Sequence, residues 1–251
     1  MGICTIVAEY NPFHSGHMYH ISQTKQILGE SSDIVAIMSG NYVQRGDFAI
    51  VEKYARAKAA VLSGVDLVLE LPLTAALSSA EGFAFGALSV ADALGCVSNL
   101  SFGCENDNLE ALNRLAEVID KEEFSLLLKS ELFEGVSFPV ARQNAVKKIM
   151  PQYSGLLEKP NNILAIEYIK AIKKLDSNII PIGVCRQGAS HDSIVADSDF
   201  ASASFIRELI KNGKTEKCAN YMPQSSIEVF KREHRRESSW GNKRIFRAST
   251  E

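Results

Sequence analysis

The chain has 251 residues, of which 46% are hydrophobic and 23% charged, and this ordinary globular composition excludes a disordered or fibrous protein. A net charge of −3 and an isoelectric point near 6.0 exclude a globally basic nucleic-acid-binding surface and leave room only for a local basic patch. The five cysteines form no CxxC pair, and neither a secretory signal nor an apolar run of the ~20 residues in a membrane span is visible. We therefore expect a cytoplasmic protein with reduced cysteines and no membrane partner.

Apolar runs alternate with helical patterns through the first hundred residues. Strands are expected at Ile3–Ala8, Asp33–Met38, Val65–Leu71 and Val97–Phe102. Helices are expected between them, at residues 16–28, 52–63 and 79–94. A strand–helix unit every ~30 residues predicts an α/β fold whose parallel sheet carries helices on both faces.

A mainly helical pattern follows over residues 109–175 and predicts a helical insertion, with helices at 110–128, 140–149 and 162–175. A strand at 178–184 is expected to return the chain to the sheet, before a short helix at 202–211.

The end of the chain differs in composition. Residues 231–251 are rich in Lys, Arg, Ser and Glu and show no apolar period, so we expect a solvated tail without regular structure. The predicted organisation is one α/β domain over residues 1–212, followed by a C-terminal remnant or disordered tail over 213–251.

Two histidines flank a glycine where the first strand gives way to the first helix. The carboxyl ends of parallel strands and the N-termini of helices both bind phosphate well. Gly16 lets a phosphate approach the backbone closely. His14 and His17 are three residues apart, so both imidazoles are expected to face one side and donate hydrogen bonds as charge builds on phosphorus. We predict that both are catalytic.

These histidines have two other interpretations. A metal site would add His20, but side chains turn by ~100° per residue, so His14 and His20 diverge by ~120°, which suits one tetrahedral site poorly. No HExxH pattern lies nearby, and no metal site is predicted. A pair of capping or surface histidines is the plainer alternative, and it is disfavoured by the glycine between them and the buried strand before them.

The stretch from Glu9 to His20 (Glu-Tyr-Asn-Pro-Phe-His-Ser-Gly-His-Met-Tyr-His) resembles the HxGH signature of the HIGH nucleotidyltransferase superfamily. It resembles one branch more closely, the tRNA(Met) cytidine acetate ligases. Residues 38–47, 66–72 and 159–168 resemble the same branch, so the resemblance extends over residues 3–212. It implies a Rossmann-like ATP-binding domain.

The resemblance also implies a set of ATP-binding residues: Val7, Ala8, Glu9, Tyr10, Asn11, Pro12, Phe13, His14, Ser15, Gly16, His17, Met18, Tyr19, His20, Gly103, Asn161, Asn162, Arg186, Ser202, Ser204 and Arg207. Without the resemblance, Gly103 is typical of a turn and Asn161 is typical of a helix N-cap. Arg186 ends a strand, where a guanidinium suits phosphate. The helix start from Ser202 to Arg207 suits either a serine cap or the β- and γ-phosphates.

Polar residues in the loop after the second strand, Ser39, Gln44 and Arg45, are candidates for contacts with substrate or nucleotide. Loops at the carboxyl ends of strands usually face the ligand crevice. The alternative is a surface loop whose Arg45 pairs with Asp47 at little energetic gain.

The reaction implied by the resemblance has two steps. Acetate attacks the α-phosphate of ATP, with Mg²⁺ expected on the phosphates, and the acetyl-adenylate then acylates N4 of the wobble cytidine of elongator tRNA(Met). A small-molecule adenylyl- or cytidylyltransferase and a catalytically impaired nucleotide- or tRNA-binding module remain alternatives. Members of the family run well beyond this length, so we expect a shortened C-terminus and weakened tRNA acetylation.

Overall fold

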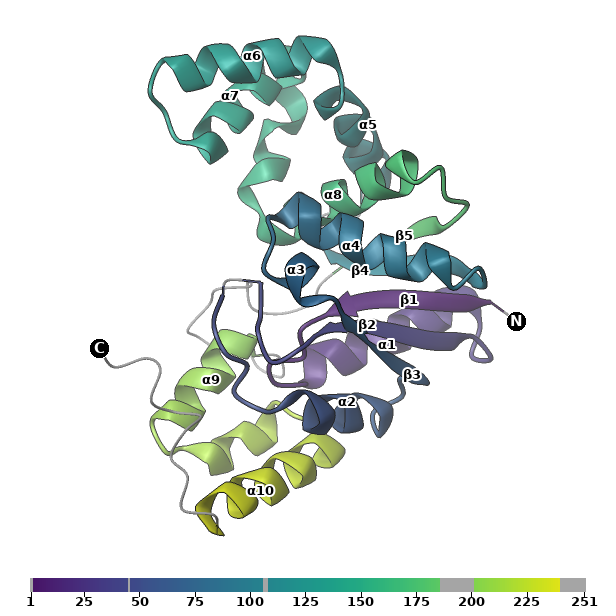
Figure 1. Ribbon diagram of the computed structural model, residues 1–251, viewed down its shortest axis with the longest axis vertical. Coiled ribbons are helices and arrows are strands. Elements are labelled where there is room, and N and C mark those ends of the chain that lie inside the picture. The colour runs from purple at the N-terminus through teal and green to yellow at the C-terminus, as the bar shows by residue number, and fades with distance from the viewer. Residues whose placement is uncertain (1, 45, 106–107, 186–200, 240–251) are drawn as a thin grey trace.

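A five-stranded parallel sheet, in the order β3-β2-β1-β4-β5, forms the centre of the molecule (Figure 1). The computed structural model describes residues 2–44, 46–105, 108–185 and 201–239, with side chains described as far as residue 233. Its strands are β1 (Ile3–Ala8), β2 (Asp33–Ser39), β3 (Leu67–Leu71), β4 (Val97–Cys104) and β5 (Ile180–Cys185). β1 is central and pairs in parallel with both β2 and β4. The predicted α/β class is confirmed.

Helices cover both faces of the sheet, as expected. They are α1 (Ser15–Leu28), α2 (Lys53–Val61), α3 (Leu73–Ala76), α4 (Ala80–Ala93), α5 (Leu109–Ile119), α6 (Glu122–Phe133), α7 (Phe138–Ile149), α8 (Pro160–Lys174), α9 (Ala203–Lys211) and α10 (Gln224–Ser239), with 3₁₀ turns η1 (Pro151–Glu158) and η2 (Thr215–Asn220). Within the part of the chain so described, none of these helices has the length and apolarity needed to cross a membrane.

Two hydrophobic clusters, one on each face, explain why the strands read as unbroken apolar runs. In β2, Ile37 belongs to the cluster with α4, α5 and α8, whereas Ile34, Ala36 and Met38 belong to the cluster with α1, α2, α9 and α10. All four side chains are buried. A strand covered on both faces needs apolar residues at every position.

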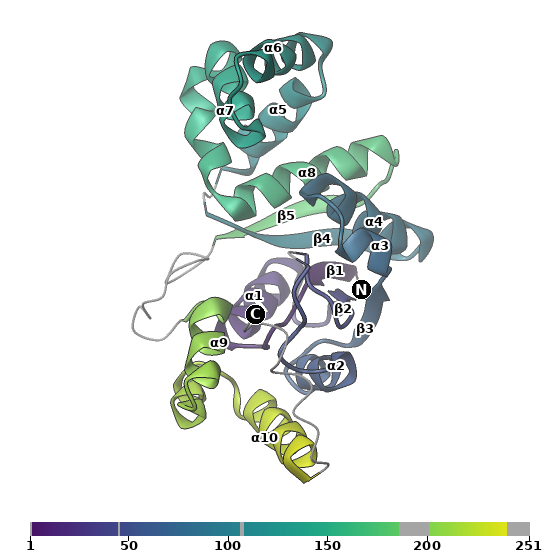
Figure 2. The same ribbon diagram turned by 60° about the vertical axis from the view of Figure 1, so that its left-hand side comes forward.

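The helical insertion differs from the prediction in one respect. The helix expected at residues 110–128 is two helices, α5 and α6, because Lys121 takes an extended conformation (φ −80°, ψ 150°) and becomes the N-cap of α6. Glu122 and Glu123 fill the first turn of α6, where carboxylates favour a new helix start. Figure 2 shows α5–α7 on the opposite side of the sheet from α9 and α10.

The expectation of a tail without regular structure is wrong as far as Ser239, because α10 runs from Gln224 to Ser239. Ile227, Val229 and Phe230 are buried in the same cluster as α2. These apolar residues precede the basic stretch, which then continues the helix with Lys231 and Arg232 exposed. Composition alone concealed the helix because only one side of it is apolar.

Candidate nucleotide-binding site

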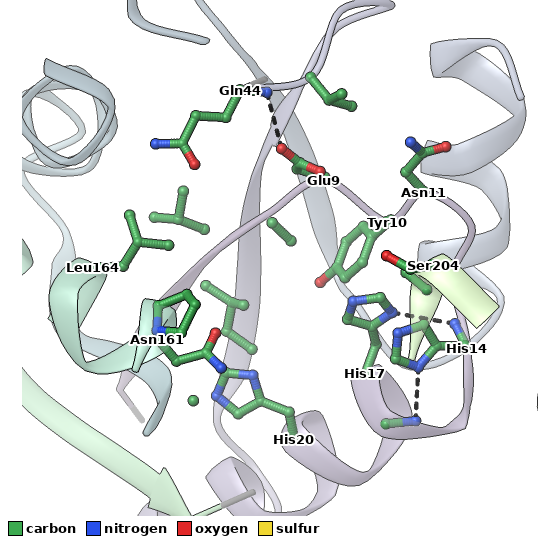
Figure 3. Close-up of a pocket in the computed structure, with 18 of the residues that line it drawn as sticks. Glu9, Tyr10, Asn11, His14, His17, His20, Gln44, Asn161, Leu164 and Ser204 are labelled. Carbon is green, nitrogen blue, oxygen red and sulfur yellow. Dashed lines mark hydrogen bonds between the residues drawn. The ribbon is translucent and has the colours of Figure 1, made fainter. Parts of the chain in front are cut away.

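A cavity of about 530 Å³ opens at the carboxyl edge of the sheet, which is where ligands bind in open α/β folds. Its walls come from the end of β1, the start of α1, the loop after β2, the ends of β4 and β5, and helices α8 and α9. Figure 3 shows Glu9 and Gln44 at one end, with His14, His17 and Ser204 on another side.

The start of α1 is closed by a reciprocal cap made from two histidines. His14 is the N-cap, and its Nδ1 accepts a hydrogen bond from the Gly16 amide at 3.0 Å. The His14 amide in turn donates to Nδ1 of His17 at 3.2 Å. The two ring centroids lie 3.8 Å apart. The prediction that both imidazoles face the same side is confirmed. The alternative interpretation, that the histidines cap the helix, is also correct.

This cap fixes the tautomer of both rings. A neutral imidazole has one donor and one acceptor nitrogen, and in both histidines Nδ1 is the acceptor. Nε2 therefore carries the proton in both His14 and His17. Since both residues line the cavity, the helix start presents two neutral N–H donors to a ligand there.

Aromatic packing holds His17 in place. The ring of Tyr10 meets the imidazole edge to face at 4.9 Å and 83°, and Phe13 packs against it at 5.4 Å. The Tyr10 hydroxyl is buried and has no hydrogen-bond partner among the described residues. Burial raises the pKa of the Tyr10 phenol above its ordinary value, so this group stays protonated at neutral pH.

Gly16 is required for the geometry of the cap as well as for access to the backbone. A Cβ added at this position would lie 2.9 Å from Cε1 and 3.0 Å from Nδ1 of His14. A side chain here would push the His14 ring away from the Gly16 amide, which donates a hydrogen bond to it.

Arg56 on α2 organises the strand ends beneath the cavity, and its role was missed in the sequence. The side chain is 1% exposed and donates to the backbone carbonyls of Glu9, Ser39 and Gly40, as well as to Val51 at 2.9 Å. Burial lowers the pKa of the guanidinium to about 10, which leaves it charged at neutral pH. The sequence signal that could have indicated a buried, functional arginine was its position among the alanines of one helix face.

The start of α9 supplies a second polar wall. Ser202 is the N-cap, and its hydroxyl accepts from the Phe205 amide at 3.0 Å. Arg207 donates to the Asn11 carbonyl at 2.9 Å and to the Ser204 hydroxyl at 2.8 Å. Arg207 thereby ties α9 to the loop that carries the histidines, a connection across 196 residues of sequence.

Asparagines at the start of α8 face the end of β4. The helix begins at Pro160 with Lys159 as N-cap, so the alternative interpretation of Asn161 as an N-cap is wrong. Instead, Asn161 donates to Oε1 of Glu105 at 3.0 Å, and Asn162 accepts from the Glu105 amide at 3.1 Å. Asn161 lines the cavity beside Gly103, whereas Asn162 lies beneath it.

His20 lines the cavity but faces the sheet. Its Nε2 lies 2.8 Å from the Ser101 hydroxyl, so it does not converge with His14 and His17. Across the ranges that the structure describes, no group of three or more His, Cys, Asp or Glu side chains is arranged to hold a metal ion.

Most of the predicted ATP-binding residues meet at the cavity. Those that line it are Val7, Ala8, Glu9, Tyr10, Asn11, His14, Gly16, His17, Tyr19, His20, Gly103, Asn161, Ser204 and Arg207. Those that do not are Pro12, Phe13, Ser15, Met18, Asn162 and Ser202. Gln44 lines the cavity, and Ser39 is buried away from it. Arg45 and Arg186 lie outside the described residues.

Several lining residues were not predicted, and helical spacing could have found them. Leu164 and Tyr168 follow Asn161 at three and seven positions on α8, and Lys211 follows Arg207 at four positions on α9. Residues at these spacings share one face of a helix.

A sheet of this order with a histidine-capped helix at its carboxyl edge is the architecture of a nucleotidyltransferase. The chain matches the HIGH Nucleotidyl Transferase family over residues 1–249, and it belongs to that family. The more specific likeness is to the tRNA(Met) cytidine acetate ligases. That of Caldanaerobacter subterraneus subsp. tengcongensis is 41% identical over 231 residues, 90% of this chain and 57% of the relative.

Other relatives agree. The tRNA(Met) cytidine acetate ligase of Clostridium novyi is 44% identical over 85% of this chain and 54% of the relative. The crystal structure of apo TmcAL from Thermotoga maritima has a TM-score of 0.88 at 38% identity, over 94% of this chain and 57% of that one. TmcAL bound with alpha-thio ATP gives 0.86 at 38% identity, over 94% and 56%. This chain spans somewhat more than half the length of these relatives.

Proposed function

We propose that this chain is an ATP-dependent ligase that activates acetate as acetyl-adenylate and acetylates N4 of the wobble cytidine of elongator tRNA(Met). The observation that carries the proposal is the reciprocal histidine cap, which holds two Nε2–H donors at the N-terminus of α1. The names of the relatives and the ATP analogue bound by TmcAL support the choice of substrates.

In this proposal the phosphates of ATP lie at the starts of α1 and α9. His14 and His17 donate to the α-phosphate, and Arg207 and Ser204 lie toward the β- and γ-phosphates. The nucleoside lies against Gly103 and Asn161, where the chain offers backbone and amide groups beside apolar side chains. This arrangement spreads ATP over elements from both ends of the sequence.

In the first step, an oxygen of acetate attacks the α-phosphorus and pyrophosphate leaves. The neutral Nε2–H groups of His14 and His17 hydrogen-bond the oxygens on which negative charge builds, without a change of protonation. Mg²⁺ would enter on the ATP phosphates, because it prefers hard oxygen ligands. Its chemistry would be to neutralise phosphate charge.

The test is acetate-dependent exchange of labelled pyrophosphate into ATP. Exchange that requires acetate, and that phosphopantetheine or nicotinate mononucleotide cannot support, is the expected result. Exchange with one of those phosphate acceptors would favour a small-molecule nucleotidyltransferase. ATP binding without any exchange would favour a nucleotide-binding module.

A further inference from the structure

The charges that line the cavity are divided between two regions. The described cationic side chains in the lining, Arg207 and Lys211, both lie on α9. The described carboxylates in the lining are Glu9 and Asp47, at the end of β1 and in the loop after β2. ATP and acetate are both anions, so a carboxylate in their pocket opposes their binding. Glu9 therefore calls for a role outside the first step.

Glu9 is held firmly for a half-buried carboxylate. Its Oε1 accepts a hydrogen bond from the Gln44 amide at 3.0 Å, a contact drawn in Figure 3. Its backbone carbonyl accepts from the buried guanidinium of Arg56. Both ends of the residue are thus fixed, and the carboxylate lies in the cavity wall between Gln44 and Tyr10.

The negative charge of Glu9 also acts across the cavity. Burial, and then the charge of Glu9, raises the pKa of the Tyr168 phenol on α8. Both residues line the cavity, Tyr168 from α8 and Glu9 from the end of β1. A ligand group placed between them meets a hydrogen-bond acceptor on the β1 side.

The second step of the proposed reaction needs such an acceptor. The exocyclic amine of a cytosine is a weak nucleophile because its lone pair is delocalised into the ring. Forming an amide at that nitrogen also releases a proton, which a carboxylate within hydrogen-bond reach can take. Glu9 immediately precedes Tyr10, whose ring contacts His17, so it belongs to the strand end beside the proposed reacting phosphate.

Resting on the proposed function, we infer that Glu9 binds the exocyclic amine of the acceptor cytidine and accepts its proton during acetyl transfer. The amine nitrogen forms a bond to the acetyl carbon, and the bond from that carbon to the adenylate oxygen breaks. AMP leaves with the electron pair. The proton passes to the Glu9 carboxylate and then to water.

The experiment compares Glu9→Gln with the unmodified chain in the two half-reactions. Acetate-dependent pyrophosphate exchange reports the first, and acetyl transfer to a tRNA(Met) transcript reports the second, with uridine in place of the target cytidine as the acceptor control. Glu9→Gln is expected to lower transfer about 10²-fold or more relative to exchange. Glu30→Gln, an exposed change outside the cavity, is the matched control and should alter neither rate.

Adenine also carries an exocyclic amine, and the same variant tests it. If Glu9→Gln lowers exchange as much as transfer, or raises KM for ATP but not for inosine triphosphate, Glu9 is an ATP contact and the inference is wrong. If the unmodified chain catalyses exchange but acetylates neither transcript, the inference fails for this chain while the first step stands. Absence of exchange would overturn the first step itself.

Discussion

At the scale of single residues, the histidine cap joins folding and the proposed chemistry in the same two side chains. The Nδ1 atoms of His14 and His17 accept hydrogen bonds from backbone amides, which leaves Nε2 as the protonated donor in each ring. The sequence correctly predicted that the two imidazoles face the same side. It could not predict the tautomer, because that depends on which backbone amides the folded turn brings to each ring.

The first prediction concerns His17→Ala. Removing one preorganised donor should lower the rate of acetate-dependent exchange by about 10²- to 10³-fold. Loss of the cap should lower the free energy of unfolding by only about 1 kcal/mol. The control is Gln26→Ala, on the exposed side of the same helix. Exchange by His17→Ala at the unmodified rate would show that this imidazole takes no part in the first step.

The second prediction concerns Gly16→Ala, whose new Cβ would lie 2.9 Å from the His14 ring. The ring or the helix start must shift, so we expect a destabilisation of about 1–3 kcal/mol and a rate loss of more than tenfold. Gly155→Ala is the matched control, since nothing lies within 4 Å of a Cβ there. Equal effects of the two changes on denaturant unfolding and exchange would argue against the cap geometry.

At the scale of elements, the strand ends depend on a helix far from the motif. Arg56 on α2 joins the carbonyls at the ends of β1 and β2. The elements themselves could be predicted from periodicity because each apolar run is local. The connection through Arg56 could not be predicted, because it depends on the register of β1 beside β2 and on the position of α2 over both.

The third prediction follows from that connection. Arg56→Met keeps much of the side-chain volume but leaves several buried carbonyls without a donor, so unfolding should become easier by more than about 3 kcal/mol. Arg114→Met, which removes an exposed arginine with 57% of its side chain accessible, should change stability by less than about 0.5 kcal/mol. Urea unfolding of both variants is the measurement. A small effect at Arg56 would mean that water replaces the guanidinium readily.

At the scale of the whole molecule, the cavity is lined by residues from both hydrophobic clusters, between Ile6 and Lys211 in the sequence. The α/β class, the parallel sheet and the place of the cavity at its carboxyl edge followed from strand–helix alternation. Helix α10 did not, because it buries one apolar side against α2 and its basic remainder resembles a solvated tail in sequence.

The fourth prediction is that ATP stabilises the whole fold. A ligand spanning α1, α8 and α9 binds only the folded state, so ATP at 100 times its Kd should add about 2.7 kcal/mol and raise Tm by about 5–10 °C. Differential scanning calorimetry measures this shift. An unchanged Tm, or an equal rise in Gly16→Ala, would place ATP elsewhere.

The most direct measurement of the central proposal follows an oxygen atom. If acetate labelled with ¹⁸O attacks the α-phosphorus and the amine later attacks the acetyl carbon, one labelled oxygen must remain in the AMP released. Mass spectrometry of AMP after turnover with the acceptor tRNA should therefore find one ¹⁸O in each molecule formed. AMP without the label would contradict activation of acetate as acetyl-adenylate.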